Sequence, residues 1–330
     1  GMGGSILGSE AINDFLKYKI KKKIYFFNNL DEDKISNFKK KEISSRVLFI
    51  IISKSGNTIE TLSNTFLLNI LKKNAKNIIL ISEKKNSLLF SLVKKFNLFY
   101  VEHKKNIGGR YSVLSEVGII PAYLMGVNIN KIRSKILYYT KAKSKLLLKE
   151  NTIKLASLIN SKKFNSLVFL NYAPELEQFL YWSQQLIAES LGKKNKGLLP
   201  IISNAPKDHH SLLQLYLDGP KDKLFYIFSC EKNSKEKIKI NIEKSSKNFL
   251  NKKKLSKIKN AQKDALIKVF NEQNIPFREF KIKTINEEIL GKLFSLFIVE
   301  TIIIGKLLGI NPFDQPAVEK VKNYTKQKLS

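Results

Sequence analysis

The chain has 330 residues, enough for two domains, and its 43% hydrophobic content supports a large core, which excludes wholesale disorder. A single cysteine, Cys230, excludes a disulfide framework and a thiolate metal cluster. The net charge of +31 suggests nucleic-acid binding as a possible function. However, only four of the 59 basic residues are arginine, and the lysines are spread along the chain. We therefore expect a solvated basic surface and no nucleic-acid partner.

Short runs of β-branched and aromatic residues alternate along the chain with segments of helical hydrophobic period. Residues 58–73, for example, carry apolar side chains at helical spacing. The predicted strands are residues 24–28, 47–53, 77–82 and 99–101 in the first part, and 167–172, 224–229 and 277–284 in the second. The alternation predicts an α/β fold with parallel sheets that have helices on both faces.

The boundary between two such units is predicted in the helical stretch after Gly126, giving units of residues 1–130 and 131–330. Residues 131–161 read as one long linking helix, and the lysine-rich residues 231–268 read as an insert without an assigned function. Glu300 and Lys306 interrupt the most apolar stretch, residues 293–310, so a buried helix is expected there and no membrane segment. No signal peptide is recognised, and a cytoplasmic protein is expected.

A hydroxyl-rich turn follows the buried run 47–52 and opens an amphipathic helix. A helix start has free backbone N–H groups and a dipole that favours an anion. The turn lacks the Gly-Lys-Ser/Thr spacing of a nucleotide triphosphate loop, so it predicts a phosphate site for a small molecule, with simple helix capping as the alternative. Its residues are Ser53-Lys54-Ser55-Gly56-Asn57-Thr58-Ile59-Glu60-Thr61.

Two glycine-rich stretches suit close approach of the backbone to a ligand. The first is the opening Gly1-Met2-Gly3-Gly4-Ser5, for which a flexible chain end is the alternative. The second is Gly108-Gly109-Arg110, just past a predicted strand end, where ligands bind in open α/β sheets. The Arg110 guanidinium can stabilise negative charge that develops on a substrate oxygen, and a surface arginine after a turn is the alternative.

The second half supplies acid–base candidates. Glu189 lies at the end of a predicted helix that stops near Gly192. His209 and His210 are adjacent but lack further metal ligands at suitable spacing, so one of them is a candidate proton-transfer group. Near the C-terminus, a helix is predicted to start at Pro316. Gln315 and Lys322 are seven residues apart, which is two helical turns, so on one helix they would share a face and point to the same site. A lysine-rich surface helix is the alternative.

These motifs, in this order, resemble the glucose-6-phosphate isomerase family of the sugar isomerase (SIS) superfamily. The resemblance rests on residues 53–61, on the Gly-Gly-Arg-x-Ser segment 108–112, on the histidine motif 208–214 and on the C-terminal stretch 311–322. It implies two SIS domains, a C-terminal helix, a homodimer with active sites near the subunit interface, and no metal or cofactor. The implied substrates are glucose 6-phosphate and fructose 6-phosphate, interconverted through a cis-enediolate.

The resemblance also implies a role for each matched residue. Arg110 would stabilise the enediolate, Glu189 would be the catalytic base, and His210, from the neighbouring subunit, would open the sugar ring together with Lys322. Gln315 would contact the substrate, Gly4 and Ser5 would line the sugar side, and the phosphate would be held by Ser53, Lys54, Ser55, Thr58 and Thr61. The alternatives are an SIS sensor that binds a phosphosugar without turnover and an isomerase that also accepts mannose 6-phosphate. Because the family has a helical region and a strand ahead of the glycine-rich opening, the first domain is expected to be truncated.

Overall fold

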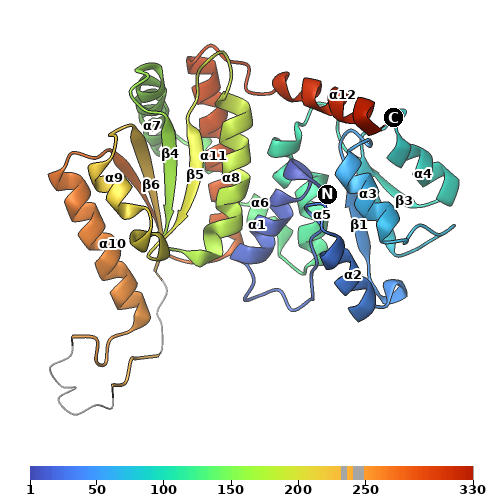
Figure 1. Cartoon of the computed structure of the whole chain (residues 1–330), viewed down its shortest axis with the longest axis horizontal. Helices are drawn as coiled ribbons and strands as arrows, with labels where there is room; N and C mark the ends of the chain where they lie inside the picture. Colours follow the sequence, from blue (N-terminus) through green and yellow to red (C-terminus); the bar gives the residue numbers. More distant parts are fainter. Residues whose placement is uncertain (232–235, 241–248, 330) are drawn as a thin grey trace.

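Two parallel β-sheets lie at opposite ends of the molecule, with helices between and around them (Figure 1). The computed structural model describes residues 1–231, 236–240 and 249–329. The α/β architecture expected from the sequence, with parallel sheets, flanking helices and a C-terminal helix, is confirmed.

The first sheet consists of β1 (Phe49–Ile52), β2 (Ile78–Ser82) and β3 (Phe99–Glu102), in that spatial order. Successive side chains of a strand point to opposite faces. Phe49 and Ile51 therefore share one core with α2 (Glu32–Lys41) and α4 (Leu88–Phe96), while Ile52 packs with Val117 of α5 (Glu116–Leu124). The hydroxyl-rich turn joins β1 to α3 (Ile59–Leu67), as expected.

The second sheet has the order β5 (Leu199–Asn204), β4 (Ser166–Asn171), β6 (Lys223–Cys230), β7 (Phe277–Ile282). On one face, Val168 and Leu170 pack against α9 (Leu213–Asp218) and α10 (Leu255–Glu272). On the other face, Phe169 and Phe228 pack against α8 (Glu177–Leu191) and α11 (Glu287–Leu307). Both faces are covered, which explains why β4 and β6 read as continuous hydrophobic runs.

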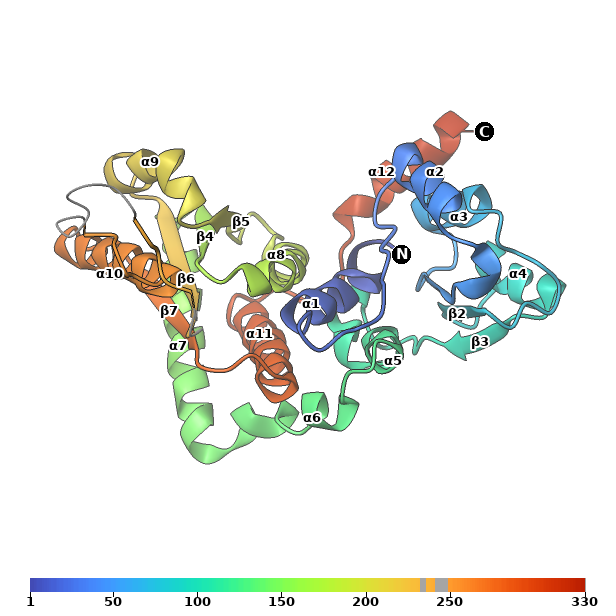
Figure 2. The ribbon, with the colours of Figure 1, turned by 90° about the horizontal axis from the view of Figure 1, so that it is seen from below.

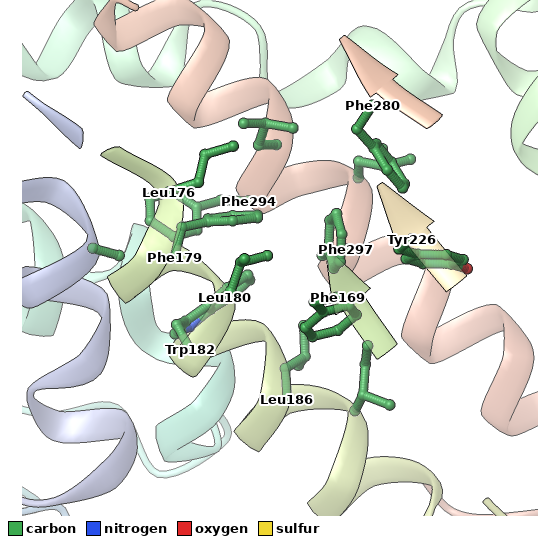
Figure 3. Close-up of a cluster of buried hydrophobic side chains, with 14 of the residues drawn as sticks. Phe169, Leu176, Phe179, Leu180, Trp182, Leu186, Tyr226, Phe280, Phe294 and Phe297 are labelled. Atoms are coloured by element: carbon green, nitrogen blue, oxygen red, sulfur yellow. The ribbon is translucent and has the colours of Figure 1, made fainter. Parts of the chain in front are cut away.

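An aromatic core lies between this sheet and its helices (Figure 3). The rings of Trp182 on α8 and Phe294 on α11 meet edge to face, with centroids 4.8 Å apart. Phe15 of α1 (Leu7–Phe15) belongs to the same cluster, and Figures 1 and 2 both show α1 lying beside α8. The N-terminal helix is therefore anchored to the core of the second unit and brings the glycine-rich opening next to α8.

One predicted strand is wrong, and one strand was missed. Residues 24–28 belong to no sheet, and a cavity of about 450 Å³ is lined by residues 22–27 together with residues of β1. They had the residue types of a strand but no strand to pair with. β5 was missed because Pro200, Ser203 and Asn204 interrupt its apolar pattern; it lies at the sheet edge, where proline is tolerated.

The single linking helix predicted over residues 131–161 is also wrong. The chain forms α6 (Ile129–Arg133), a 3₁₀ helix at Ile136–Thr140 and then α7 (Ala142–Asn160). The Ser295 hydroxyl of α11 donates to the carbonyl of Ile136, and the Lys292 ammonium lies 3.6 Å from the centre of the Tyr138 ring. These contacts with α11 hold the 3₁₀ turn, so tertiary packing outweighs the helical period of the sequence.

The remaining helices complete the chain. The exposed helix α12 (Ala317–Leu329) starts one residue after Pro316, as the sequence indicated. Part of the expected lysine-rich insert, residues 232–235 and 241–248, lies outside the described residues, and its last part forms the start of α10. None of the helices in the described ranges combines the length and apolar character needed to cross a bilayer. The other 3₁₀ helices are Gly3–Ser5, Ser44–Arg46, Gly109–Leu114, Pro174–Leu176 and Lys207–His210.

Candidate active site

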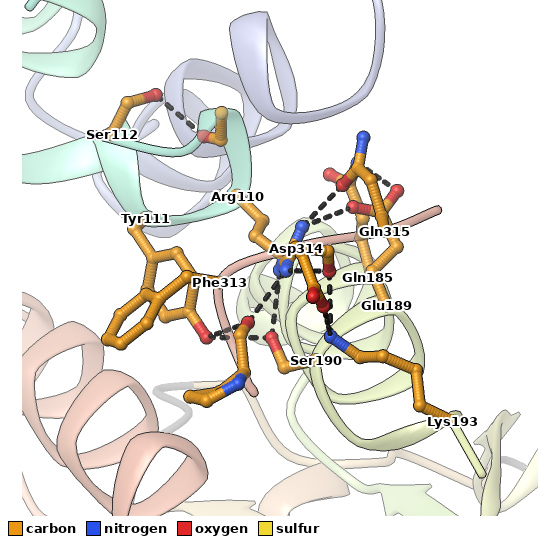
Figure 4. Close-up of polar contacts among 12 residues, drawn as sticks. Arg110, Tyr111, Ser112, Gln185, Glu189, Ser190, Lys193, Phe313, Asp314 and Gln315 are labelled. Carbon is orange, nitrogen blue, oxygen red and sulfur yellow. Dashed lines mark hydrogen bonds and ion pairs between the residues drawn. The ribbon is translucent and has the colours of Figure 1, made fainter. Parts of the chain in front are cut away.

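Arg110 is the centre of a polar network that joins three distant parts of the chain (Figure 4). Its side chain is only 2% exposed, and all five of its N–H donors have an acceptor. Nε donates to the Ser190 hydroxyl at 2.8 Å, and Nη2 donates to the carbonyls of Pro312 at 2.7 Å and Asp314 at 3.0 Å. These bonds fix the plane of the guanidinium.

The remaining nitrogen of Arg110, Nη1, donates to side-chain oxygens, whereas Nη2 donates to backbone carbonyls. Nη1 donates to Glu189 Oε2 at 3.0 Å and to Gln315 Oε1. An incoming substrate oxygen can replace either acceptor without disturbing the anchored half of the guanidinium. Nη1 is therefore the part of Arg110 that can stabilise charge on a ligand.

Glu189 lies in the last turn of α8 and is held at both carboxylate oxygens. Oε2 accepts from Arg110, while Oε1 accepts from Gln185 Nε2 at 2.9 Å. The Glu189 side chain remains 30% exposed, so the carboxylate is positioned yet open to a ligand. Gln185 was missed by sequence reasoning, although its place four residues before Glu189 puts it on the same helix face and could have identified it.

The glycine-rich opening packs directly against the loop that carries Arg110. A Cβ on Gly4 would lie 2.2 Å from the carbonyl carbon of Gly109 and 2.5 Å from the amide nitrogen of Arg110. Gly3, at φ +51°, lies so close to α8 that a Cβ would be 2.7 Å from Gln185 Nε2. Only glycine at position 4 allows these two backbones to touch, so the opening supports the position of Arg110.

The hydroxyl-rich turn has the geometry expected of an anion site. Ser53 Oγ and Ser55 Oγ lie 2.8 Å and 3.3 Å from Thr58 Oγ1, so three hydroxyl groups gather ahead of α3. Gly56 adopts φ +68°, and a Cβ there would be 2.2 Å from the Ser87 hydroxyl. The first N–H groups of α3 and these hydroxyls are the donors that a phosphate requires.

Lys54 connects this turn to the Arg110 loop. Its ammonium donates to the carbonyls of Lys105 at 2.9 Å and Ile107 at 2.8 Å. Burial is the main cause that lowers the pKa of Lys54, while nearby Glu83 opposes the shift. Because Ile107 is only three residues from Arg110, at most about 10 Å of chain separates them. The turn and the arginine are thus parts of one region.

Thr61 and Ser5 are two further residues with predicted substrate-binding roles. The Thr61 side chain is 3% exposed, and its hydroxyl has no hydrogen-bond partner among the described residues. Both residues line the cavity beside β1. Their expected substrate-binding roles remain predictions.

His103, which directly follows β3, is buried. It is 1% exposed, and its Nδ1 lies 3.1 Å from Glu116 Oε1, although neither ring nitrogen has a well-aligned hydrogen-bond partner in the described chain. Burial lowers the pKa of His103, and the Glu116 carboxylate only partly opposes this. The imidazole is therefore a neutral structural group at pH 7.

His210 lies away from the Arg110 network. It ends the 3₁₀ helix Lys207–His210, and the preceding strand residue Asn204 donates to Glu177, at the start of α8. Glu177 and Glu189 are 12 residues apart on that helix, which corresponds to about 18 Å. The two acid–base candidates are thus at opposite ends of α8 within one chain. Neighbouring His209 contributes its Nε2 to a 2.6 Å hydrogen bond with the buried Tyr172 hydroxyl.

Gln315 and Lys322 do not share a helix face. Gln315 lies ahead of α12, so the two-turn argument from the sequence was wrong, although Gln315 does reach Arg110. Lys322 is exposed on α12 and its ammonium contacts Glu319 Oε1 at 2.6 Å. Among the described residues, no three His, Cys, Asp or Glu side chains gather as a metal site would require.

The chain is similar to known proteins over its whole length. Residues 1–199 match the family model for phosphoglucose isomerase. A probable glucose-6-phosphate isomerase of Methanococcus maripaludis is 34% identical over 345 residues, covering 100% of this chain and 77% of that protein. The glucose-6-phosphate isomerase of Methanocaldococcus jannaschii is also 34% identical, covering 98% of this chain and 81% of that protein.

Solved structures show the same fold. A hypothetical protein of Thermus thermophilus superposes with a TM-score of 0.87 at 25% identity, covering 100% of this chain and 82% of the other. A glucose-6-phosphate isomerase of Chlamydia trachomatis gives a TM-score of 0.81 at 20% identity, covering 100% and 68%. With the family model spanning more than half of the residues and relatives above 30% identity, this chain belongs to the phosphoglucose isomerase family.

Proposed function

We propose that this protein interconverts glucose 6-phosphate and fructose 6-phosphate through a cis-enediolate, in the cytoplasm, as a step of glycolysis and gluconeogenesis. The observation that carries the proposal is the placement of the Glu189 carboxylate 3.0 Å from the buried, fully hydrogen-bonded Arg110. Family membership supplies the substrate class, and the geometry supplies a base beside a fixed cation.

The chemistry follows from what aldose–ketose isomerisation requires. A base must remove a proton from C2 and return it to C1, while negative charge develops on the neighbouring oxygens. Glu189 is the base, and Arg110 Nη1 is the donor that stabilises the enediolate oxyanion. Gln185 holds the second carboxylate oxygen of Glu189, which aims the carboxylate at the substrate carbons.

The phosphate of the substrate occupies the turn ahead of α3. Its donors are the hydroxyls of Ser53, Ser55 and Thr58 and the first N–H groups of the helix, with Lys54 supplying positive charge. Binding there fixes one end of the sugar, so the reacting carbons at the other end reach Glu189 in one orientation.

The protein acts as a homodimer in which His210 reaches the site of the partner subunit. The support is the separation of His210 and Glu189 by the length of α8 within one chain. His210 and Lys322 then handle ring opening, one near the ring oxygen and one near the anomeric hydroxyl. Lys322 is exposed on α12, which follows directly after Gln315, so a bound substrate can recruit it from its contact with Glu319.

A coupled assay with fructose 6-phosphate tests the reaction. We expect turnover by the wild type and loss of turnover in Glu189→Gln with phosphosugar binding kept. Glu288→Gln, which changes an exposed glutamate at the start of α11 paired with Lys135, serves as the control and should keep wild-type turnover. Wild-type turnover by Glu189→Gln contradicts the assignment of the base. Tight binding without turnover by the wild type favours the sensor, and nuclear magnetic resonance of the products detects any mannose 6-phosphate.

Mixing two inactive variants tests the shared site. Glu189→Gln and His210→Ala chains, unfolded and refolded together, form hybrid dimers in which one of the two sites has both native residues. Since half of the dimers are hybrids, about one quarter of the wild-type activity returns. No recovery from a mixture that forms dimers would show that both groups act within one chain.

A further inference from the structure

Lys193 is held more tightly than the other lysines around it. It follows Gly192, the C-terminal cap of α8, and its side chain is only 13% exposed. Its ammonium donates to the carbonyl of Asn311, to the carbonyl of Asp314 at 2.7 Å and to Asp314 Oδ1 at 2.8 Å. All three donors of the ammonium therefore point to the segment between α11 and α12.

That segment is the one that anchors Arg110. The Asp314 carbonyl accepts from both Lys193 and Arg110 Nη2, and the Pro312 carbonyl accepts from Arg110 Nη2 and from the Tyr111 hydroxyl. Asn311 adds an internal bond, because its Nδ2 donates to Asp314 Oδ2 at 3.0 Å. The next residue, Gln315, contacts Nη1 of Arg110.

We propose that Lys193 is a positioning residue for the isomerisation, which clamps the segment 311–315 onto the end of α8 and thereby holds Arg110 and Gln315 against Glu189 (Figure 4). The inference rests on the proposed function for its effect on rate, and on the contacts alone for its effect on structure. It assigns Lys193 no contact with the substrate.

Two observations separate this clamp from an ordinary surface ion pair. Lys193 lies just past the C-terminal cap of α8, and its ammonium contacts join that helix end to a segment more than 100 residues away in the chain. Two of its three acceptors are backbone carbonyls, which are anchored more rigidly than a carboxylate. The ion pair also lowers the pKa of Asp314, chiefly through the hydrogen bond from Lys193, so the carboxylate is ionised throughout the neutral range.

The test compares Lys193→Met with Lys194→Met. Lys194 is the adjacent lysine, and within the described part of the chain its ammonium donates one long hydrogen bond, to the Gly309 carbonyl at 3.4 Å, so it is a matched control. We expect Lys193→Met to lower kcat by about 10- to 100-fold, as misplacement of catalytic groups does, with a much smaller change in KM. Lys194→Met keeps the wild-type kcat, and Lys193→Arg recovers part of the loss because it restores a cation and donors.

Hydrogen exchange of the peptide that spans residues 309–317 measures how firmly this segment is held, and the measurement does not depend on enzyme activity. We expect faster exchange in Lys193→Met than in the wild type or Lys194→Met, at an unchanged unfolding midpoint. Equal exchange and equal kcat in the two methionine variants would overturn the inference, as would a loss confined to KM. If the wild type has no isomerase activity, the proposed function fails, while the exchange comparison still decides whether Lys193 clamps the segment.

Discussion

Replacing Gly4 with alanine tests how the glycine-rich opening supports Arg110, the proposed stabiliser of the enediolate. The new Cβ would lie 2.2 Å from the carbonyl carbon of Gly109, 2.3 Å from its oxygen and 2.5 Å from the amide nitrogen of Arg110. All three atoms belong to the backbone, so no side chain can rotate away. Restoring an acceptable 3.4 Å contact to the nearest atom requires a shift of 3.4 − 2.2 = 1.2 Å.

The size of the effect follows from that shift. Overpacking of a closely packed site costs about 1–3 kcal/mol of unfolding free energy. Arg110 is held by bonds to α8 and to the C-terminal segment, so moving its backbone strains the guanidinium contacts with Glu189. A displacement near 1 Å in a catalytic constellation lowers the rate by about 10²-fold. We therefore expect a folded, less stable variant whose kcat falls by about that factor.

Gly109→Ala is the matched control on the other side of the same contact. A Cβ at Gly109 would meet its nearest neighbour, the Cα of Gly4, at 3.9 Å, and Gly109 has no positive φ. Both variants change the unfolded chain in the same way, so their difference reports the folded state alone. Urea unfolding and steady-state assays with fructose 6-phosphate are the measurements. Equal stability and equal kcat in the two variants would refute the reasoning.

Two further predictions concern the phosphate turn and the buried histidine. Ser55→Ala combined with Thr58→Ala should raise KM for fructose 6-phosphate by at least about tenfold, because hydrogen bonds to a charged group are lost. The decrease in kcat should be smaller than the increase in KM. An unchanged KM in the steady-state assay would contradict the assignment of the turn as the phosphate site. Burial lowers the pKa of His103 in the folded state, so below about pH 6.5 the unfolded state binds more protons than the folded state. The free energy of unfolding therefore decreases as the pH is lowered. Urea midpoints at pH 7.5 and 5.5 should therefore drop more for the wild type than for His103→Asn, and equal drops would show that His103 is not responsible.

Much of the fold could be predicted from the sequence because most of the strands are buried on both faces. The run Phe49–Ile52 is apolar throughout, and so are the central residues Leu224–Phe228 of β6; strand–helix alternation then identifies a parallel α/β architecture. The predictions were wrong where packing against another segment of the chain determines the local structure. Residues 24–28 have strand composition but no strand beside them, and the helix expected over residues 131–161 is broken where α11 packs against it.

Three of the candidate site residues could be singled out from the sequence, but their contacts could not. Arg110, Glu189 and Gln315 were singled out from their motifs, and the structure brings them together. Helical spacing could have placed Gln185 beside Glu189, but the hydrogen bond between them depends on side-chain rotamers. The contact of Lys193 with the segment ahead of Gln315 joins elements distant in the chain, so the sequence could not show it.

A crystal structure of the Glu189→Gln variant with bound fructose 6-phosphate tests the central claim most directly. The account predicts a phosphate within hydrogen-bond distance of the hydroxyls of Ser53, Ser55 and Thr58, with C1 and C2 about 3–3.5 Å from the side chain of residue 189 and an oxygen of the sugar on Arg110 Nη1. A phosphate bound elsewhere, or substrate carbons beyond reach of residue 189 from either subunit, would contradict it.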